Sequence, residues 1–164
     1  MNKENIEIEK KFLVNRTLWE SSVFKKNARR VYLKQGYLSN SRHATIRIRL
    51  KKNQGILTIK GRNTGLERSE YEYTIPYKDA CQIFDNLCLN SISKYRYTFT
   101  YQNFIWEVDE FEGEQYPLII AEVELENAQQ DPTLPPFITR DVSLDFRYTN
   151  AQLAQKPFGS WEQT

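Results

Sequence analysis

Apolar and polar residues alternate along much of this chain, and six short segments share one form of that alternation. In each segment two charged residues flank one apolar or aromatic residue: Glu7-Ile8-Glu9, Arg47-Ile48-Arg49, Glu70-Tyr71-Glu72, Lys94-Tyr95-Arg96, Glu107-Val108-Asp109 and Glu122-Val123-Glu124. Because successive side chains of a β-strand point to opposite faces, both charges of a segment share one face. The pattern therefore predicts strands that are charged on one face and apolar on the other.

Alternation, together with β-branched and aromatic content, predicts eight strands in all. Their approximate ranges are 5–13, 30–38, 43–51, 55–62, 67–76, 92–101, 104–112 and 118–126. The short spacings within 43–76 and within 92–126 imply hairpins in an antiparallel meander. Eight antiparallel strands can close into a barrel, which removes exposed edges and encloses packed side chains or one small ligand.

Two longer gaps between the strands predict helices. Thr17-Leu18-Trp19-Glu20 fits a capping box that opens a helix ending near residue 26. Pro76 precedes a second helix near 77–89, where apolar residues recur at helical spacing. Both helices are expected to cover the apolar outside of the sheet. Prolines in 131–136 predict a loop, and residues 150–154 predict a short final helix.

Whether the charged face of each strand points to solvent or into the barrel depends on where the apolar face of the same strand packs. One charged doublet is ordinarily a solvated strand face, and cross-strand Glu–Arg pairs on an open sheet would give the same pattern. Six doublets with apolar residues between them instead favour charges that face each other across a closed interior. The acidic residues of this set are Glu7, Glu9, Glu70, Glu72, Glu107, Asp109, Glu122 and Glu124, and the basic ones are Lys11, Arg47, Arg49, Lys60, Lys94 and Arg96.

This set of charges predicts the ligands of the interior. Two like charges ~4 Å apart repel by about 4 kcal/mol at an effective dielectric of ~20, and divalent cations would remove that cost for the carboxylates. Carboxylate oxygens without His or Cys partners favour Mg²⁺, Mn²⁺ or Ca²⁺. The cations then require an anion, and a polyphosphate suits both Arg and Lys.

Length, net charge and the few His and Cys residues limit the number of domains and the kinds of binding site that we expect. With 164 residues and a net charge of +2, we expect a single domain over residues 1–164 without a general nucleic-acid or membrane surface. No apolar run approaches the length of a membrane span or resembles a signal peptide, so a cytoplasmic protein is expected. His43, the only histidine, excludes multi-histidine metal sites and is either structural or a substrate contact. Cys81 and Cys88 are expected to be buried, reduced thiols.

The ordered set of charged strands resembles the CYTH, or triphosphate tunnel metalloenzyme, superfamily. The family begins with a Glu-x-Glu-x-Lys strand, which Glu7-Ile8-Glu9-Lys10-Lys11 reproduces. Arg47-Ile48-Arg49 corresponds to its Arg-x-Arg strand, and Lys60 to the lone lysine of the next strand. The later doublets follow in the family's order, and the tail Asp145-Phe146-Arg147-Tyr148-Thr149-Asn150 is similar to the family's.

The resemblance implies a mainly β (α+β) fold, an eight-stranded antiparallel tunnel that cleaves triphosphates with one or two Mg²⁺ or Mn²⁺ ions. The implied metal ligands are Glu7, Glu9, Glu107, Asp109, Glu122 and Glu124. The implied catalytic residues are Glu7, Glu9, Lys11, Glu107 and Asp109. The implied substrate-binding residues are Lys11, Arg47, Arg49, Lys60, Glu70, Glu72, Lys94 and Arg96.

Three functions remain open at this point. Hydrolysis of inorganic triphosphate or a small organic triphosphate is favoured, because the cations suit phosphates and no comparable set for a purine is present. The alternatives are a class IV-type adenylate cyclase and a non-catalytic polyphosphate-binding module. The expected partner is a small-molecule triphosphate, with no membrane or specific nucleic acid, and a homodimer is left open. A P-loop mechanism is excluded, because the chain has no Gly-x-x-x-x-Gly-Lys motif.

Overall fold

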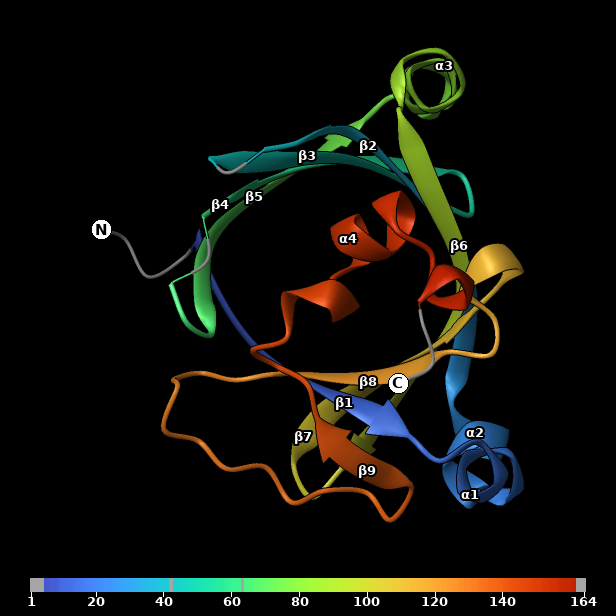
Figure 1. The fold of residues 1–164 in the computed structure, drawn as a ribbon, viewed down its shortest axis with the longest axis vertical. Coiled ribbons are helices and arrows are strands. Elements are labelled where there is room, and N and C mark those ends of the chain that lie inside the picture. The colour runs from blue at the N-terminus through green and yellow to red at the C-terminus, as the bar shows by residue number, and fades with distance from the viewer. Residues whose placement is uncertain (1–4, 42, 63, 162–164) are drawn as a thin grey trace.

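Eight antiparallel strands close into a barrel in the computed structural model, which describes residues 5–41, 43–62 and 64–161 (Figure 1). Around the barrel the order is β1-β5-β4-β3-β2-β6-β7-β8 and back to β1. The strands are β1 Ile6–Val14, β2 Arg29–Asn40, β3 Ala44–Lys51, β4 Gln54–Gly61, β5 Glu67–Ile75, β6 Asn90–Tyr101, β7 Phe104–Phe111 and β8 Ile119–Glu124. The predicted closed eight-stranded barrel is confirmed.

The first strand has two partners along the same edge. Residues 6–8 of β1 pair with β5 and close the barrel, whereas residues 12–14 pair with a ninth strand, β9 Ile138–Asp141. The alternation pattern did not predict β9, because four residues are too few to show a period and the prolines just before them indicated only a loop.

Two short helices, α1 Arg16–Ser21 and α2 Val23–Asn27, stand where one helix was predicted. The break lies at Ser22, whose extended backbone ends α1 and whose hydroxyl accepts from the amide of Lys25 in α2. The cap of α1 is Asn15 rather than Thr17, since Asn15 Oδ1 accepts from Leu18 N at 3.0 Å. Because Asn15 and Ser22 each cap a helix, the segment forms two short helices instead of the one predicted.

The outside of the barrel is covered as predicted over part of its surface. Trp19 of α1 is completely buried and packs edge-on against Tyr97 of β6 and Phe137 before β9. Helix α3, Tyr77–Leu87, lies over β3 and β4. It comes so close that a Cβ on Gly55 would stand 2.3 Å from the Cβ of Ala80. None of the helices in the described ranges combines the length and apolarity needed to cross a membrane.

The two cysteines lie at α3 and are free, in line with the prediction of reduced thiols. Both are partly exposed rather than buried. A Cβ on Gly36 of β2 would stand 2.6 Å from Cys88 Sγ, so the end of α3 also packs directly on the sheet. The cysteines therefore belong to the outer covering of the barrel.

The end of the chain enters the barrel (Figure 1). We call residues 146–161 the plug; it contains the 3₁₀ turns η3 Phe146–Tyr148 and η4 Phe158–Ser160 and the helix α4 Asn150–Gln155. Its Tyr148, Leu153 and Ala154 are buried in one apolar cluster with Leu118, just before β8, and with the strand residues Tyr37, Ile92, Phe111 and Ile120. One end of the interior is thus an apolar core, and the charged residues are confined to the other end.

The plug is anchored by a buried amide. Gln115, after β7, donates from Nε2 to the carbonyl of Leu153 at 2.9 Å and accepts at Oε1 from the amide of Phe158 at 2.9 Å. Both bonds satisfy backbone groups of the plug that would otherwise be buried without partners. The plug is therefore fixed to the barrel wall by specific bonds as well as by apolar packing.

Candidate active site

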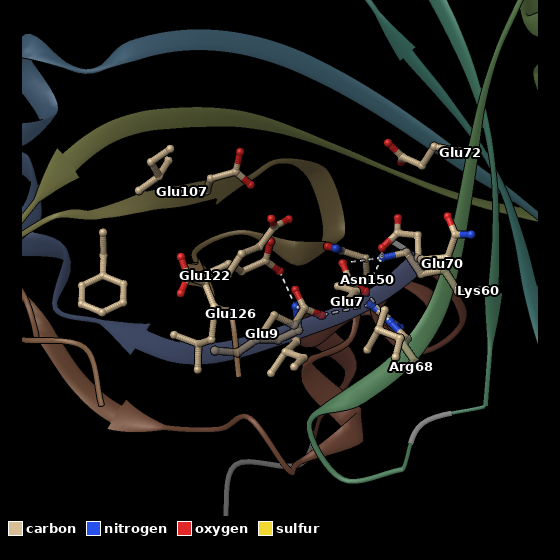
Figure 2. Close-up of a pocket in the computed structure, with 18 of the residues that line it drawn as sticks. Glu7, Glu9, Lys60, Arg68, Glu70, Glu72, Glu107, Glu122, Glu126 and Asn150 are labelled. Carbon is tan, nitrogen blue, oxygen red and sulfur yellow. Dashed lines mark hydrogen bonds and ion pairs between the residues drawn. The ribbon is translucent and has the colours of Figure 1, made fainter. Parts of the chain in front are cut away.

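The charged end of the barrel encloses a cavity of about 1110 Å³ (Figure 2). Most of the predicted inward charges line it: Glu7, Glu9, Lys11, Arg47, Arg49, Lys60, Glu70, Glu72, Arg96, Glu107, Glu122 and Glu124. Lys94 and Asp109 point into the barrel as well, but they are completely buried beyond the cavity surface. Alternation along the strands therefore identified which side chains meet, although those two lie out of contact with the cavity.

At the seam between β1 and β5, cations hold the first glutamates. Lys60 Nζ lies 2.8 Å from Glu7 and 2.9 Å from Glu70. Arg68 Nε lies 2.6 Å from Glu7, and its Nη2 lies 3.0 Å from Glu9. Burial opposes ionisation of Glu7, but Lys60 and Arg68 outweigh it and hold the Glu7 pKa well below its usual range. Burial and a hydrogen bond to Glu7 raise the pKa of Glu70 to about 7.

A second wall of the cavity is rich in arginine. Arg47 Nη2 lies 3.0 Å from Thr58 Oγ1, 3.2 Å from Glu72 and 3.8 Å from Glu70, while its buried Nε has no partner among the described residues. Burial, followed by the charge of Arg47, lowers the pKa of Arg49 to about 10. A buried donor without a partner costs free energy, so this wall favours an anion that supplies the missing acceptor.

Arg96 of β6 pairs with carboxylates of the next two strands, β7 and β8. Its Nε and Nη2 lie 2.7 and 2.6 Å from the two oxygens of Asp109, and Nη2 lies 2.7 Å from Glu122. It also pairs with Glu107. Lys11 Nζ lies 2.5 Å from Glu122, so two cations act on that buried carboxylate. Burial would raise the pKa of Glu122, but Lys11 and Arg96 hold it well below its usual range.

Lys94 and Asp109 form an ion pair behind this layer. Both side chains are completely shielded from solvent. Burial lowers the pKa of Lys94 to about 8, although Asp109 opposes that shift. Lys94 also donates to Asn150 Oδ1 at 3.1 Å, so it contacts a plug residue that lines the cavity although it does not line the cavity itself.

The donors of the cavity fit a hard divalent cation in their chemistry. Glu124 lines the cavity and makes no ion pair with a described residue. Burial raises the pKa of Glu124, and the nearby charges of Glu7, Glu107 and Glu9 raise it further. A cation would relieve that repulsion, and carboxylate oxygens suit Mg²⁺ or Mn²⁺. Within the described ranges no three such groups already converge tightly enough to hold an ion, because arginine and lysine engage most of them.

Several residues that line the cavity were not predicted, among them Glu126, Gln130, Arg68 and Asn150. Arg68 precedes the Glu70 doublet by two positions and shares its face, so alternation alone could have identified it. Asn150 reaches the cavity only because the plug folds inward, which no sequence period indicates. His43 is exposed and does not line the cavity.

The closed barrel and its charged cavity define a CYTH domain, and the chain belongs to this family: the family model described as "CYTH domain" matches residues 5–156. An inorganic triphosphatase of Acetivibrio thermocellus is 40% identical over 158 residues, covering 96% of this chain and 98% of that protein. An inorganic triphosphatase of Nitrosomonas europaea is 32% identical over 152 residues, covering 90% and 96%. A crystal structure of an inorganic triphosphatase has a TM-score of 0.64 at 28% identity, covering 90% of this chain and 93% of its own.

Proposed function

We propose that this protein is a metal-dependent triphosphatase that hydrolyses inorganic triphosphate in the charged cavity. The observation that carries the proposal is the concentration of lysine, arginine and carboxylate side chains around one cavity of about 1110 Å³. The similarity to two inorganic triphosphatases supports the same substrate.

The arginine-rich wall binds the substrate. Arg47 offers a buried Nε without a described partner, and Arg49 and Lys60 line the cavity beside it. Guanidinium groups bind phosphate oxygens in pairs, and lysine contributes a point charge. Phosphoryl transfer depends mainly on positioning and on neutralisation of charge, which this wall provides.

The carboxylates hold the metal, one or two Mg²⁺ or Mn²⁺ ions. Glu7, Glu9, Glu122 and Glu124 are the main ligands that we assign, with Glu107 beside them. When bound, the ion neutralises charge that develops on the phosphate oxygens. Asp109 is fully buried against Arg96 and Lys94, so we assign it to the positioning of Arg96 rather than to direct ligation.

A panel of substrates tests the proposal. The purified protein is incubated with tripolyphosphate, thiamine triphosphate, ATP or diphosphate, with Mg²⁺, Mn²⁺ or excess chelator, while phosphate and cyclic AMP are measured. We expect kcat/KM to be highest for tripolyphosphate and activity to vanish with chelator. Conversion of ATP mainly to cyclic AMP and diphosphate would establish a cyclase instead. Tight tripolyphosphate binding without turnover under any of these conditions would establish a binding module.

A further inference from the structure

Asn150 brings the end of the chain into the cavity. It is the first residue of α4, and Figure 2 shows it among the residues of the cavity. Of the plug's described residues it alone lines the cavity. Thr149 caps the helix, its hydroxyl accepting from Gln152 N at 3.3 Å. Leu153, one turn after Asn150, is completely buried in the apolar core of the plug. The side chain of Asn150 is therefore held on a rigid support at the end of the cavity that the plug closes.

Lys94 determines which way the Asn150 amide points. Lys94 Nζ lies 3.1 Å from Asn150 Oδ1. A protonated lysine can donate hydrogen bonds but cannot accept them, so the amide oxygen must be the atom that faces it. The amide nitrogen is then turned away from Lys94, and it donates to no other described residue.

Lys94 itself is in no position to touch a ligand in the cavity. Its side chain is completely buried, it pairs with Asp109, and it is not among the residues that line the cavity. Its remaining polar contact with the site is the bond to Asn150. Any effect of Lys94 on substrate therefore passes through Asn150 or through the Asp109–Arg96 pair.

We propose that Asn150 contacts the substrate, donating from Nδ2 to a phosphate oxygen at the closed end of the cavity, and that Lys94 is the positioning residue that fixes this amide. The inference rests on the proposed function, because it requires a triphosphate in the cavity. The uncharged Asn150 amide can bind a phosphate oxygen without adding repulsion to the lysine and arginine side chains of the cavity. It also favours ligands long enough to reach it, since a shorter anion leaves the donor without a protein or ligand partner.

Asn150→Asp separates this role from a structural one. The aspartate keeps an oxygen for Lys94, so thermal stability should be unchanged or higher; because its charge also repels a polyanion, weaker binding supports the donor role only where the neutral Asn150→Leu variant shows it as well. Loss of the donor should raise the Kd for tripolyphosphate about tenfold or more, while the protein remains folded. The Kd is measured by calorimetric titration with sodium tripolyphosphate in excess chelator, and KM is measured separately with metal.

Two further variants control for charge and for folding. Asn150→Leu cannot donate but adds no charge, so it should also weaken binding about tenfold. Asn86→Asp makes the same change of charge on the exposed face of α3 and should leave the Kd unchanged. If wild-type protein binds tripolyphosphate and both Asn150 variants bind it equally well, the inference is overturned. If the wild type itself neither binds nor cleaves tripolyphosphate, the proposed function fails instead.

The positioning role of Lys94 is tested by coupling. Lys94→Met should raise the KM for tripolyphosphate in the wild-type background, and that increase should be much smaller in the Asn150→Leu background, because the amide it orients is gone. Equal increases in both backgrounds would show that Lys94 acts through Asp109 and Arg96. If Lys94→Met does not fold, the Asn150 variants alone decide the inference.

Discussion

Arg68 and Glu7 face each other across the seam that closes the barrel, directly paired in the register between β5 and β1, with Arg68 Nε 2.6 Å from the Glu7 carboxylate. The same guanidinium reaches Glu9 at 3.0 Å. Two of the carboxylates that we assign to a metal thus already have a cation partner from the neighbouring strand. A divalent ion at these glutamates must therefore compete with Arg68.

Replacing Arg68 by glutamine should strengthen metal binding. The change removes the ion pairs of Arg68 with Glu7 and Glu9, so among the described residues Glu7 keeps only Lys60 and Glu9 keeps only Lys11 as a cation partner. We expect Mg²⁺ to bind about fivefold more tightly or better in calorimetric titrations. Without metal the variant should unfold at a lower temperature than the wild type, and Mg²⁺ should restore the difference. Arg16→Gln, which removes an exposed pair with Glu20, should change neither quantity, and weaker Mg²⁺ binding by Arg68→Gln would contradict the competition.

Glu9→Gln should abolish turnover and preserve the fold. The amide keeps the size of the side chain but offers a metal a weaker ligand than a carboxylate does. Lys11, which lies 2.9 Å from Glu9, still has Glu122 as a partner at 2.5 Å, so no buried charge is left alone. Circular dichroism should match the wild type while phosphate release from tripolyphosphate falls to background. A variant with full activity would remove Glu9 from the metal site.

Arg47→Ala should impair substrate binding more than any change of an outward-facing cation. The buried guanidinium contacts Thr58 and Glu72, and its Nε has no partner in residues 5–41, 43–62 and 64–161, so the variant loses donors that could bind an anion. Truncation of a buried charged partner costs about 2–5 kcal/mol, so kcat/KM for tripolyphosphate should fall by at least about thirtyfold. Lys34→Ala, on the outer face of β2, is the matched control. Unchanged kinetics in both variants would place the substrate elsewhere.

The stability of the protein should depend on pH through Glu70. Its pKa is raised from 4.5 to about 7 by burial and by the hydrogen bond to Glu7, so the folded protein holds a proton that the unfolded chain releases earlier. The stabilisation is complete below about pH 4.5 and is lost as the pH rises through about 7. Glu70→Gln should flatten the decline in the free energy of unfolding between pH 5 and pH 7.5, measured with urea. Glu67→Gln, an exposed residue of the same strand, should retain the wild-type slope.

The period of two residues was sufficient to predict the barrel and most of its charged lining. In six strands the face opposite the charges is apolar, so charges that face one another inside a barrel, as Arg47, Glu70 and Glu72 do, are the arrangement that this pattern favours. The same period extends to Arg68 and to apolar inward residues such as Ile92 and Phe111. Those apolar inward positions indicate in the sequence that part of the barrel interior is filled with packed side chains rather than with water.

The plug could not be predicted from the sequence in the same way. Leu153 and Ala154 form an apolar side of a short helix, and such a side can pack either on the outside of a sheet or within a barrel. The choice depends on whether the inward side chains of several strands leave a space of the right shape, which is a property of the closed barrel. The position of Asn150 at the cavity could therefore be identified only from the three-dimensional structure.

The pairing of β1 also constrains the order in which the molecule folds. Hairpins such as β3–β4 and β6–β7 join residues that are close in sequence and can form early, whereas Phe12 of β1 pairs with Asp141. Contacts between such distant parts of a chain form slowly, because the entropy of closing the long loop between them is lost before the contacts stabilise the fold. We therefore expect the pairing of β1 with β9 to form late in folding. Because β1 also joins β5 to β8, the wall of the cavity is complete only when both of these pairings have formed, and binding of triphosphate during refolding would report that the barrel has closed.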